Sequence, residues 1–263
     1  MKIITLMENS SSDPELFCEH GLSLYVETGE YKILFDSGQS DRFADNAEKL
    51  GVDLTKVDFA VLSHGHYDHS GGLRRFMQIN ATAPVYVNRN AFDPYFNAAG
   101  KFIGVNLNGI DTSRIRFADD RLEIGEGICL YSCNDHTPIT AIDSFGQTRL
   151  ENEKRISDDY RHEQYLLIHE CGKRICFSGC SHKGIRNIVH WLQPDVLVGG
   201  FHYMKVPTTG EGRDFLLESA LGLLRTDAVY YTGHCTGEAQ YDVMKSAMGD
   251  RLQILSSGVR IEL

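Results

Sequence analysis

Residues 63–72 read Ser-His-Gly-His-Tyr-Asp-His-Ser-Gly-Gly, and the rest of the chain is best interpreted outward from this stretch. It follows the apolar run Phe59–Leu62 and precedes a predicted helix, Leu73–Gln78, so we expect a loop between a strand and a helix. Four side chains that can bind metal lie within six residues: His64, His66, Asp68 and His69. Imidazole and carboxylate suit zinc, iron and manganese. Chance rarely produces this cluster, and we predict a metal site.

The spacing of these four side chains suits two ions. In an extended loop, side chains two residues apart point the same way, so His64 and His66 are expected to bind one ion together. Asp68 and His69 are then left for a second ion.

This stretch resembles the signature of the metallo-β-lactamase superfamily, and two further motifs support the resemblance. Asp36–Gly38, after the predicted strand Lys32–Phe35, is similar to the first motif of that superfamily, whose aspartate supports the histidine loop. Gly233-His234, after the predicted strand Ala228–Tyr231, is similar to the last motif. The resemblance spans nearly the whole chain.

More narrowly, four motifs resemble the branch named after dihydropterin ribofuranosyl-aminobenzene phosphate synthase: Glu19–Ser23, Gly179–His182, Gly199–His202 and Gly233–Gly237. Many members of that branch have no established substrate. The resemblance implies an α/β fold (α+β in some schemes), a four-layer αββα metallo-β-lactamase-like sandwich with the site at one edge of two central sheets. We expect residues 1–263 to form one such domain.

Composition narrows the choice of partner and compartment. A hydrophobic content of 42% in 263 residues supports a sizeable core. The formal net charge of -10 argues against a nucleic acid or an anionic membrane as partner, which leaves a small-molecule substrate; the oligomeric state stays open. No apolar run approaches the ~20 residues that span a bilayer. Seven scattered cysteines without a Cys-x-x-Cys motif favour reduced thiols and a cytoplasmic protein.

The remaining ligands depart from the usual superfamily pattern. Most members use a histidine in a Gly-His-Thr-Pro-Gly loop and, later, a bridging aspartate at a strand end. Here Cys180 stands where that aspartate is expected, and His182 follows it. We rank His182 first for the missing imidazole, His136 second and His162 third. Cys180 fits either a thiolate ligand or a small buried residue, and its residue type favours packing. The implied ligand set is therefore His64, His66, Asp68, His69, His182 and His234.

Such a site implies hydrolysis. Two ions about 3.5–4 Å apart can share a bridging hydroxide and polarise the bond that it attacks. Asp68 would bind the second ion and hydrogen-bond this nucleophile. His202 follows the predicted strand Asp195–Val198. It could carry a proton or contact the substrate. Alternatively, it could hold a metal-binding residue or the backbone in position without binding the metal itself.

We therefore predict a metal-dependent hydrolase of a small ester-type or phosphoester-type substrate. Zinc is the expected ion at both positions, with manganese and iron as alternatives. Lys183, Arg186 and Lys205 lie near His182 and His202 in the sequence and weakly favour an anionic substrate.

Three alternatives stay open. One is a dihydropterin ribofuranosyl-aminobenzene phosphate synthase-like transferase, and another is a non-catalytic ligand sensor on the same fold. A di-iron oxidoreductase is disfavoured, because such members usually carry a glutamate where this chain has His66. The aromatic segment Asn88–Val105 either covers a sheet edge or forms a wall over the metal site; its aromatic residues are Phe92, Tyr95, Phe96 and Phe102.

Overall fold

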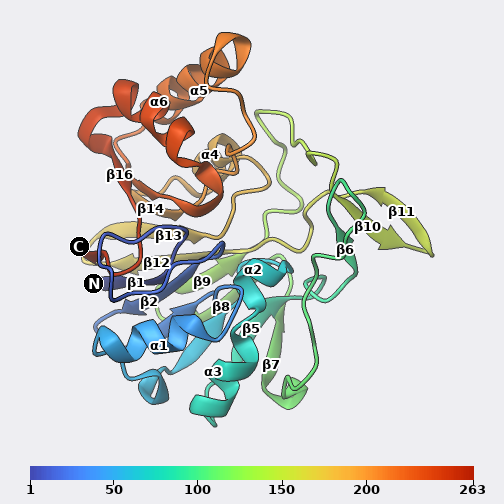
Figure 1. Cartoon of the computed structure of the whole chain (residues 1–263), viewed down its shortest axis with the longest axis vertical. Coiled ribbons are helices and arrows are strands. Elements are labelled where there is room, and N and C mark those ends of the chain that lie inside the picture. The colour runs from blue at the N-terminus through green and yellow to red at the C-terminus, as the bar shows by residue number, and fades with distance from the viewer.

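The computed structural model describes all 263 residues and has two seven-stranded sheets at its centre (Figure 1). The first sheet has the strand order β17-β1-β2-β3-β4-β5-β7. Its strands are β1 (Lys2–Met7), β2 (Ser23–Glu27), β3 (Lys32–Phe35), β4 (Phe59–Val61), β5 (Val85–Asn88), β7 (Ile115–Ala118) and β17 (Arg260–Glu262).

The second sheet has the order β16-β15-β14-β13-β12-β9-β8. Its strands are β8 (Arg121–Gly125), β9 (Ile128–Tyr131), β12 (Tyr165–Glu170), β13 (Lys173–Ser178), β14 (Val196–Gly199), β15 (Val229–Thr232) and β16 (Leu252–Ile254). A small third sheet, at the right of Figure 1, contains β6 (Tyr95–Phe96), β10 (Thr148–Glu151) and β11 (Lys154–Ser157).

Helices cover the outer faces of both large sheets (Figure 1). The α-helices are α1 (Arg42–Lys49), α2 (Tyr67–Ser70), α3 (Leu73–Ile79), α4 (Ile185–Leu192), α5 (Gly210–Leu223) and α6 (Glu238–Met248). Short 3-10 helices are η1 (Leu54–Lys56), η2 (Thr112–Arg114), η3 (His234–Thr236) and η4 (Gly249–Arg251). None of the helices is both long and apolar enough to cross a bilayer.

Alternation along the strands explains the layering. Ile4 of β1 packs with α1 and α3, whereas its neighbour Ile3 faces the second sheet. Phe177 of β13 lies between the sheets, whereas Cys176 packs towards α4, α5 and α6. Because successive side chains of a strand point to opposite faces, each sheet contributes to two apolar layers. Three hydrophobic clusters therefore separate four layers, which confirms the predicted αββα sandwich.

The strands that lead into the site run parallel to a neighbour. β3 pairs with β4 in the first sheet, and β13, β14 and β15 pair in succession in the second. Their carboxyl ends therefore meet at one edge, where the loops that follow them carry the candidate site residues.

Candidate metal centre

The structure brings together all six side chains that the sequence predicts as metal ligands, and all six are buried. Four of them come from the loop after β4 and from α2, which we call the histidine loop: His64, His66, Asp68 and His69. His182 comes from the loop after β13, and His234 follows β15. Both halves of the sandwich therefore contribute.

The first cluster consists of His64, His66 and His182, whose ligand atoms all lie within 4.8 Å of one another. The Nε2 atoms of His64 and His182 are 3.3 Å apart. His66 Nε2 and His182 Nδ1 are buried without a hydrogen-bond partner. Unpaired polar atoms are costly in a protein interior. A divalent cation held by His66 Nε2 and by the facing Nε2 atoms of His64 and His182 would give His66 Nε2 the partner that it lacks, so this donor set fits one ion.

Asp36 and Ser63 fix the tautomers of two histidines. Asp36 Oδ2 accepts hydrogen bonds from Ser63 Oγ and from His69 Nδ1, each at 2.7 Å. Because the single hydroxyl proton of Ser63 is used in this way, its oxygen accepts from His64 Nδ1 at 2.8 Å. Both imidazoles therefore carry their proton on Nδ1 and present the Nε2 lone pair to the site. This geometry gives Asp36 the supporting position that the first motif implies.

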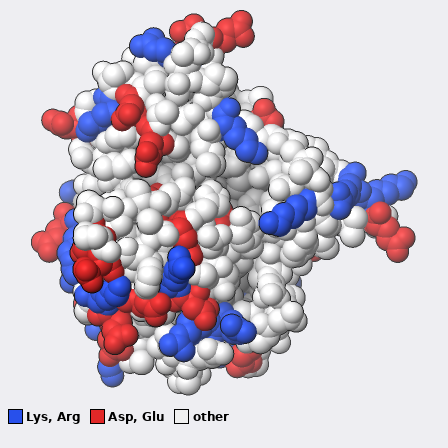
Figure 2. Space-filling view, viewed as in Figure 1, with Lys and Arg blue, Asp and Glu red and all other residues white.

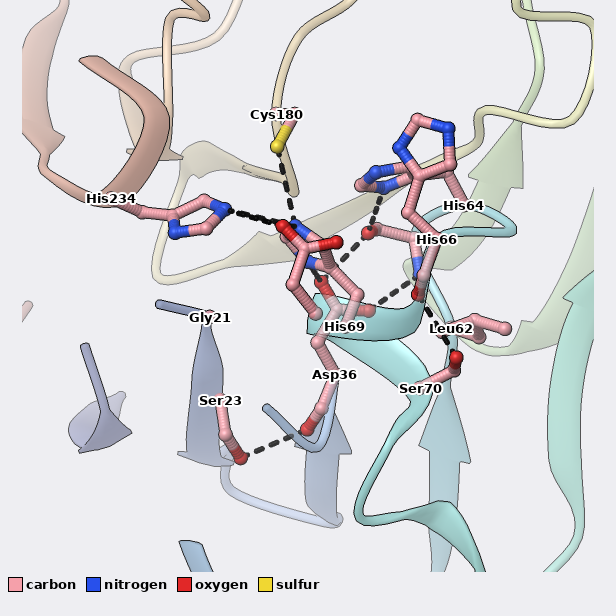
Figure 3. Close-up of polar contacts among 12 residues, drawn as sticks. Gly21, Ser23, Asp36, Leu62, His64, His66, His69, Ser70, Cys180 and His234 are labelled. Atoms are coloured by element: carbon pink, nitrogen blue, oxygen red, sulfur yellow. Dashed lines mark hydrogen bonds and ion pairs between the residues drawn. The ribbon is translucent and has the colours of Figure 1, made fainter. Parts of the chain in front are cut away.

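The second cluster consists of Asp68, His69 and His234; Figure 3 labels His69 and His234. His69 Nε2 lies 3.2 Å from His234 Nε2, and Asp68 Oδ2 lies 3.3 Å from the same His234 atom. Asn9 Oδ1 accepts a hydrogen bond of 2.9 Å from His234 Nδ1, so the Nε2 lone pair of His234 also points inward. These donors fit a second ion next to the first, since the rings of His64 and His69 are only 4.2 Å apart.

Electrostatics at the site favour a bound cation. Burial lowers the pKa of His66 to about 3 and that of His234 to about 4, so both are neutral at neutral pH, the form that binds metal. Burial alone would raise the pKa of Asp68. The neighbouring His69 is the largest of the causes that outweigh burial and hold that pKa well below its usual value. An ionised carboxylate therefore lies beside the neutral imidazoles of His66 and His234.

The two lower-ranked histidines lie outside the first cluster. His136 is exposed beside Trp191, with the ring centres 5.7 Å apart. His162 is buried, but its Nδ1 accepts from the Gly65 N–H at 2.9 Å and its Nε2 contacts Asp158 at 3.2 Å. Both nitrogens of His162 are thus used within the protein, and His182 is the one of the three that joins His64.

Three other side chains border the clusters. Cys180 Sγ lies 3.2 Å from His69 Nε2, so this thiol faces the second cluster, although its residue type favoured simple packing. His20 Nε2 lies 3.3 Å from Asp68 Oδ2. The His202 ring is 4.2 Å from the His182 ring, and its Nδ1 is buried without a partner.

Comparisons with known proteins agree with this arrangement. Residues 16–128 match the family model of the metallo-β-lactamase superfamily. The 7,8-dihydropterin-6-methyl-4-(β-D-ribofuranosyl)-aminobenzene-5'-phosphate synthase of Methanocaldococcus jannaschii is 28% identical over 262 residues, which cover 90% of this chain and 88% of that protein. The crystal structure of Tm1679, a metal-dependent hydrolase of the β-lactamase superfamily, superposes with a TM-score of 0.82 at 27% identity, covering 100% of this chain and 99% of that chain. The chain therefore resembles the metallo-β-lactamase superfamily in sequence and in fold.

A further relative is an uncharacterized protein of the same archaeon, 26% identical over 214 residues, which cover 78% of this chain and 80% of that protein. The predicted resemblance to the superfamily and to its synthase-like branch is thereby confirmed.

The sequence did not predict several residues that support the histidine loop. Besides Ser63 and Asn9, Glu163 accepts the backbone N–H groups of His182 at 2.7 Å and Lys183 at 3.1 Å. These contacts link residues far apart in the sequence, so no local sequence pattern predicts them. Only Ser63 gave a signal, because it directly precedes the motif.

The side chains suggested for substrate contact are only partly in place. The buried Lys183 ammonium donates to the Ser132 carbonyl at 2.6 Å and to Asn134 Oδ1 at 2.7 Å. Its ammonium is therefore held by neutral acceptors within the protein, and a contact with an anionic substrate stays a prediction. Of the aromatic segment, Tyr95 lies beside the site, with its ring 6.0 Å from that of His66, whereas Phe96 and Phe102 pack on each other.

Proposed function

We propose that this protein is a metal-dependent hydrolase with a two-metal site that acts on a small, anionic ester or phosphoester. The observation that carries the proposal is the pair of adjacent buried clusters, in which the Nδ1 contacts of His64, His69 and His234 turn the Nε2 atoms of these rings towards the centre. The first ion would be held by His64, His66 and His182, and the second by Asp68, His69 and His234. Zinc is the first candidate, and manganese and iron are the alternatives.

Two divalent ions, when bound, supply Lewis acidity and lower the pKa of a water towards neutrality. The residues of the chain would do the rest. Asp68, held ionised, can accept a hydrogen bond from the attacking water and so orient it. Burial, with Lys205 as a further cause, lowers the pKa of His202 to about 4, so this ring is neutral and only weakly basic at neutral pH, and its unpartnered Nδ1 would contact the substrate and not carry a proton.

A cavity next to the first cluster supports a small substrate with an apolar body and a negative charge. It has a volume of about 540 Å³ and includes both His182 and His202. Its apolar lining contains Phe145 and Phe215. Its cations are Arg186, which is already paired with Glu218 at 3.0 Å, and the exposed Lys205. In the space-filling view, mostly uncharged side chains surround the central hollow, and lysine or arginine side chains lie at its border (Figure 2).

The proposal is tested by hydrolysis of chromogenic substrates by metal-reconstituted protein. The panel contains a carboxyl ester, a lactone, a phosphomonoester and a phosphodiester. We expect turnover of at least one class, loss of activity with a chelator, and a fall of at least about 100-fold in Asp68→Asn, since positioned acid–base groups contribute 10²–10⁴-fold. The exposed Asp135→Asn is the matched control and should keep its activity. Metal binding without turnover of any class would contradict the hydrolase.

The likeness to the archaeal synthase favours one second candidate, a transferase that joins a pterin to a ribofuranosyl-aminobenzene phosphate. Product analysis by mass spectrometry after incubation with both halves would separate the two activities. A coupled product with no hydrolysis on the panel would favour the transferase. Metal binding with no product in either assay would favour the ligand sensor.

A further inference from the structure

We infer that residues 134–146, which we call the strap, form the wall that selects the substrate in the cavity beside His182. In this inference Asn187 and Tyr160 are positioning residues that hold the strap in place. The strap lies between β9 and β10 and contains no helix or strand (Figure 1). The inference rests on the hydrolase proposed above and deepens it, because it names the part of the chain that chooses the substrate.

The strap has little packing of its own. None of its residues is buried or belongs to the three hydrophobic clusters, whereas Cys133 and Gln147 on either side of it are buried. A segment with few buried contacts opens at little cost in free energy. The position of the strap therefore depends on the hydrogen bonds that attach it to the rest of the protein.

The first attachment is the side-chain amide of Asn187, which is fully buried in the first turn of α4. Its Oδ1 atom accepts the backbone N–H groups of Ile139 at 2.9 Å and Thr140 at 2.8 Å, and the Thr140 hydroxyl at 3.1 Å. Its Nδ2 atom donates to the carbonyls of Thr140 at 2.9 Å and Lys183 at 2.6 Å. One amide therefore links the middle of the strap to the residue that follows His182.

The second attachment is the hydroxyl of Tyr160, which donates to the Ser144 carbonyl at 2.8 Å. The buried Tyr160 ring stacks on the His182 ring, with the ring centres 4.4 Å apart and the planes inclined by 12°. Tyr160 thus links the far end of the strap to a candidate ligand of the first ion. Because both attachments also contact the segment around His182, they hold the strap in a fixed position relative to the first cluster.

The strap places side chains in the cavity next to the first cluster. Four of its residues line this cavity of about 540 Å³: Thr140, Ala141, Asp143 and Phe145. The Phe145 ring lies 5.0 Å from the His202 ring. The backbone φ of Phe145 is 50°, a left-handed conformation that is unfavourable for a bulky residue and is often found at functional sites. Phe145 is therefore the strap residue that contacts the apolar part of a substrate.

The test compares a variant of each attachment with a matched control. Asn187→Leu removes every hydrogen bond of the amide, and Asn80→Leu does the same for a buried amide that holds the loops around η1. Tyr160→Phe keeps the ring on His182 and removes only the hydroxyl. Its control is Tyr230→Phe, whose hydroxyl donates to a backbone carbonyl at 3.1 Å in the apolar layer beneath α5.

The fluorescence of Trp191 reports the strap without any substrate. Trp191 is the only tryptophan of the chain, and its Nε1–H group donates to the Thr137 carbonyl at 3.0 Å. Quenching of this fluorescence by acrylamide should increase in Asn187→Leu, because the strap no longer covers the indole. Quenching in Asn80→Leu should match the wild type.

Cleavage by chymotrypsin after Phe145 is a second readout that needs no substrate. The rate follows the population of the open strap, so we expect a two- to tenfold rise in Tyr160→Phe, about what the loss of a single hydrogen bond gives. Asn187→Leu loses several hydrogen bonds and should be cleaved at least about tenfold faster. The rate in Tyr230→Phe and Asn80→Leu should stay at the wild-type value.

The kinetic readout uses the substrate class that the wild-type protein hydrolyses. A strap that is in place for only about a tenth of the time raises KM about tenfold. We expect this rise in Asn187→Leu and a smaller one in Tyr160→Phe, with kcat changed by less than about twofold, because the candidate ligands and Asp68 are untouched. Phe145→Ala should lower kcat/KM about two- to tenfold more for a phenyl substrate than for its methyl counterpart, the range of one aromatic contact.

The possible failures are distinguishable. Wild-type quenching and cleavage in Asn187→Leu would overturn the attachment; if this variant does not fold, cleavage and KM in Tyr160→Phe decide instead. A strap that opens in the variants while KM and substrate preference stay unchanged would overturn its role in selection and leave the hydrolase standing. A wild-type protein that hydrolyses no substrate on the panel would contradict the hydrolase and the selection, whereas quenching and cleavage would still decide the attachment.

Discussion

The hydroxyl of Ser63 connects two candidate ligands of different ions. It donates to Asp36, which orients His69, and it accepts the Nδ1 proton of His64. Ser63→Ala would leave both groups without this partner in a buried site. We expect a loss of about 10–100-fold in metal affinity, as is typical when a group that orients a ligand is removed. Competition with a chromophoric chelator measures it.

Ser70→Ala is the matched control, because this buried hydroxyl donates to the His66 carbonyl and forms no hydrogen bond with an imidazole nitrogen. Equal losses of affinity in both variants would show that Ser63 acts through packing and not through ring orientation.

At the scale of residues, the sequence predicted the six converging side chains because their motif spacing is local or lies at strand ends. The residues that orient them could not be found in this way. Asn9 reaches His234 across 225 positions, and only the folded sheets bring the two together. The same limit explains Lys183, whose neighbours in the sequence suggested the site although its side chain turns to Ser132.

At the scale of elements, the site depends on the close approach of two loops, one after β4 and one after β13. A Cβ added at Gly179 would lie 2.1 Å from Ser63 Oγ and 3.0 Å from His64 Nδ1. Gly179→Ala must therefore separate the loops. We expect a loss of bound metal at the first position and a drop of about 1–3 kcal/mol in the free energy of unfolding, typical of overpacking.

Gly29→Ala is the control for this substitution, since its added Cβ would meet only Glu170 Oε1, at 3.5 Å. Urea unfolding and elemental analysis of both variants give the comparison. Wild-type metal content in Gly179→Ala would contradict the tight contact.

Buried strands were predictable as elements, and exposed ones were not. The bounds of β3 match the predicted strand Lys32–Phe35, because its apolar run ends at turn residues. The hairpin β10–β11 lies within segments that had little periodicity, and its side chains are mostly exposed or half-buried. A strand without a buried face shows no alternation of apolar and polar residues, so the sequence does not predict it.

At the scale of the whole molecule, the apolar layer between the sheets should contribute to the free energy of unfolding but not to metal binding. Leu130 of β9 is fully buried there, away from the site loops. Leu130→Ala should lower the free energy of unfolding by about 2–5 kcal/mol. The exposed Leu221→Ala should change it by no more than about 0.5 kcal/mol. Urea denaturation measures both; a loss of bound metal in folded Leu130→Ala would contradict this separation.

Each proposed ion takes ligands from both halves of the sandwich, so metal removal should weaken the whole fold. A ligand at about 1,000 times its Kd stabilises the native state by about 4 kcal/mol. We expect a chelator to lower the unfolding temperature in one cooperative step, and added zinc to restore it. An unchanged melting curve, with metal verified as removed, would contradict binding across the two sheets.

The most direct test of the two-metal centre is the number of ions bound per chain, measured by elemental mass spectrometry on protein purified without a histidine tag or chelators. We predict about two ions in the wild type, about two in the exposed-histidine variant His136→Ala, and about one in His182→Ala. Two ions retained in His182→Ala would contradict the assignment of the first cluster. No bound metal in the wild type, even after reconstitution with zinc, manganese or iron, would contradict the two-metal centre altogether.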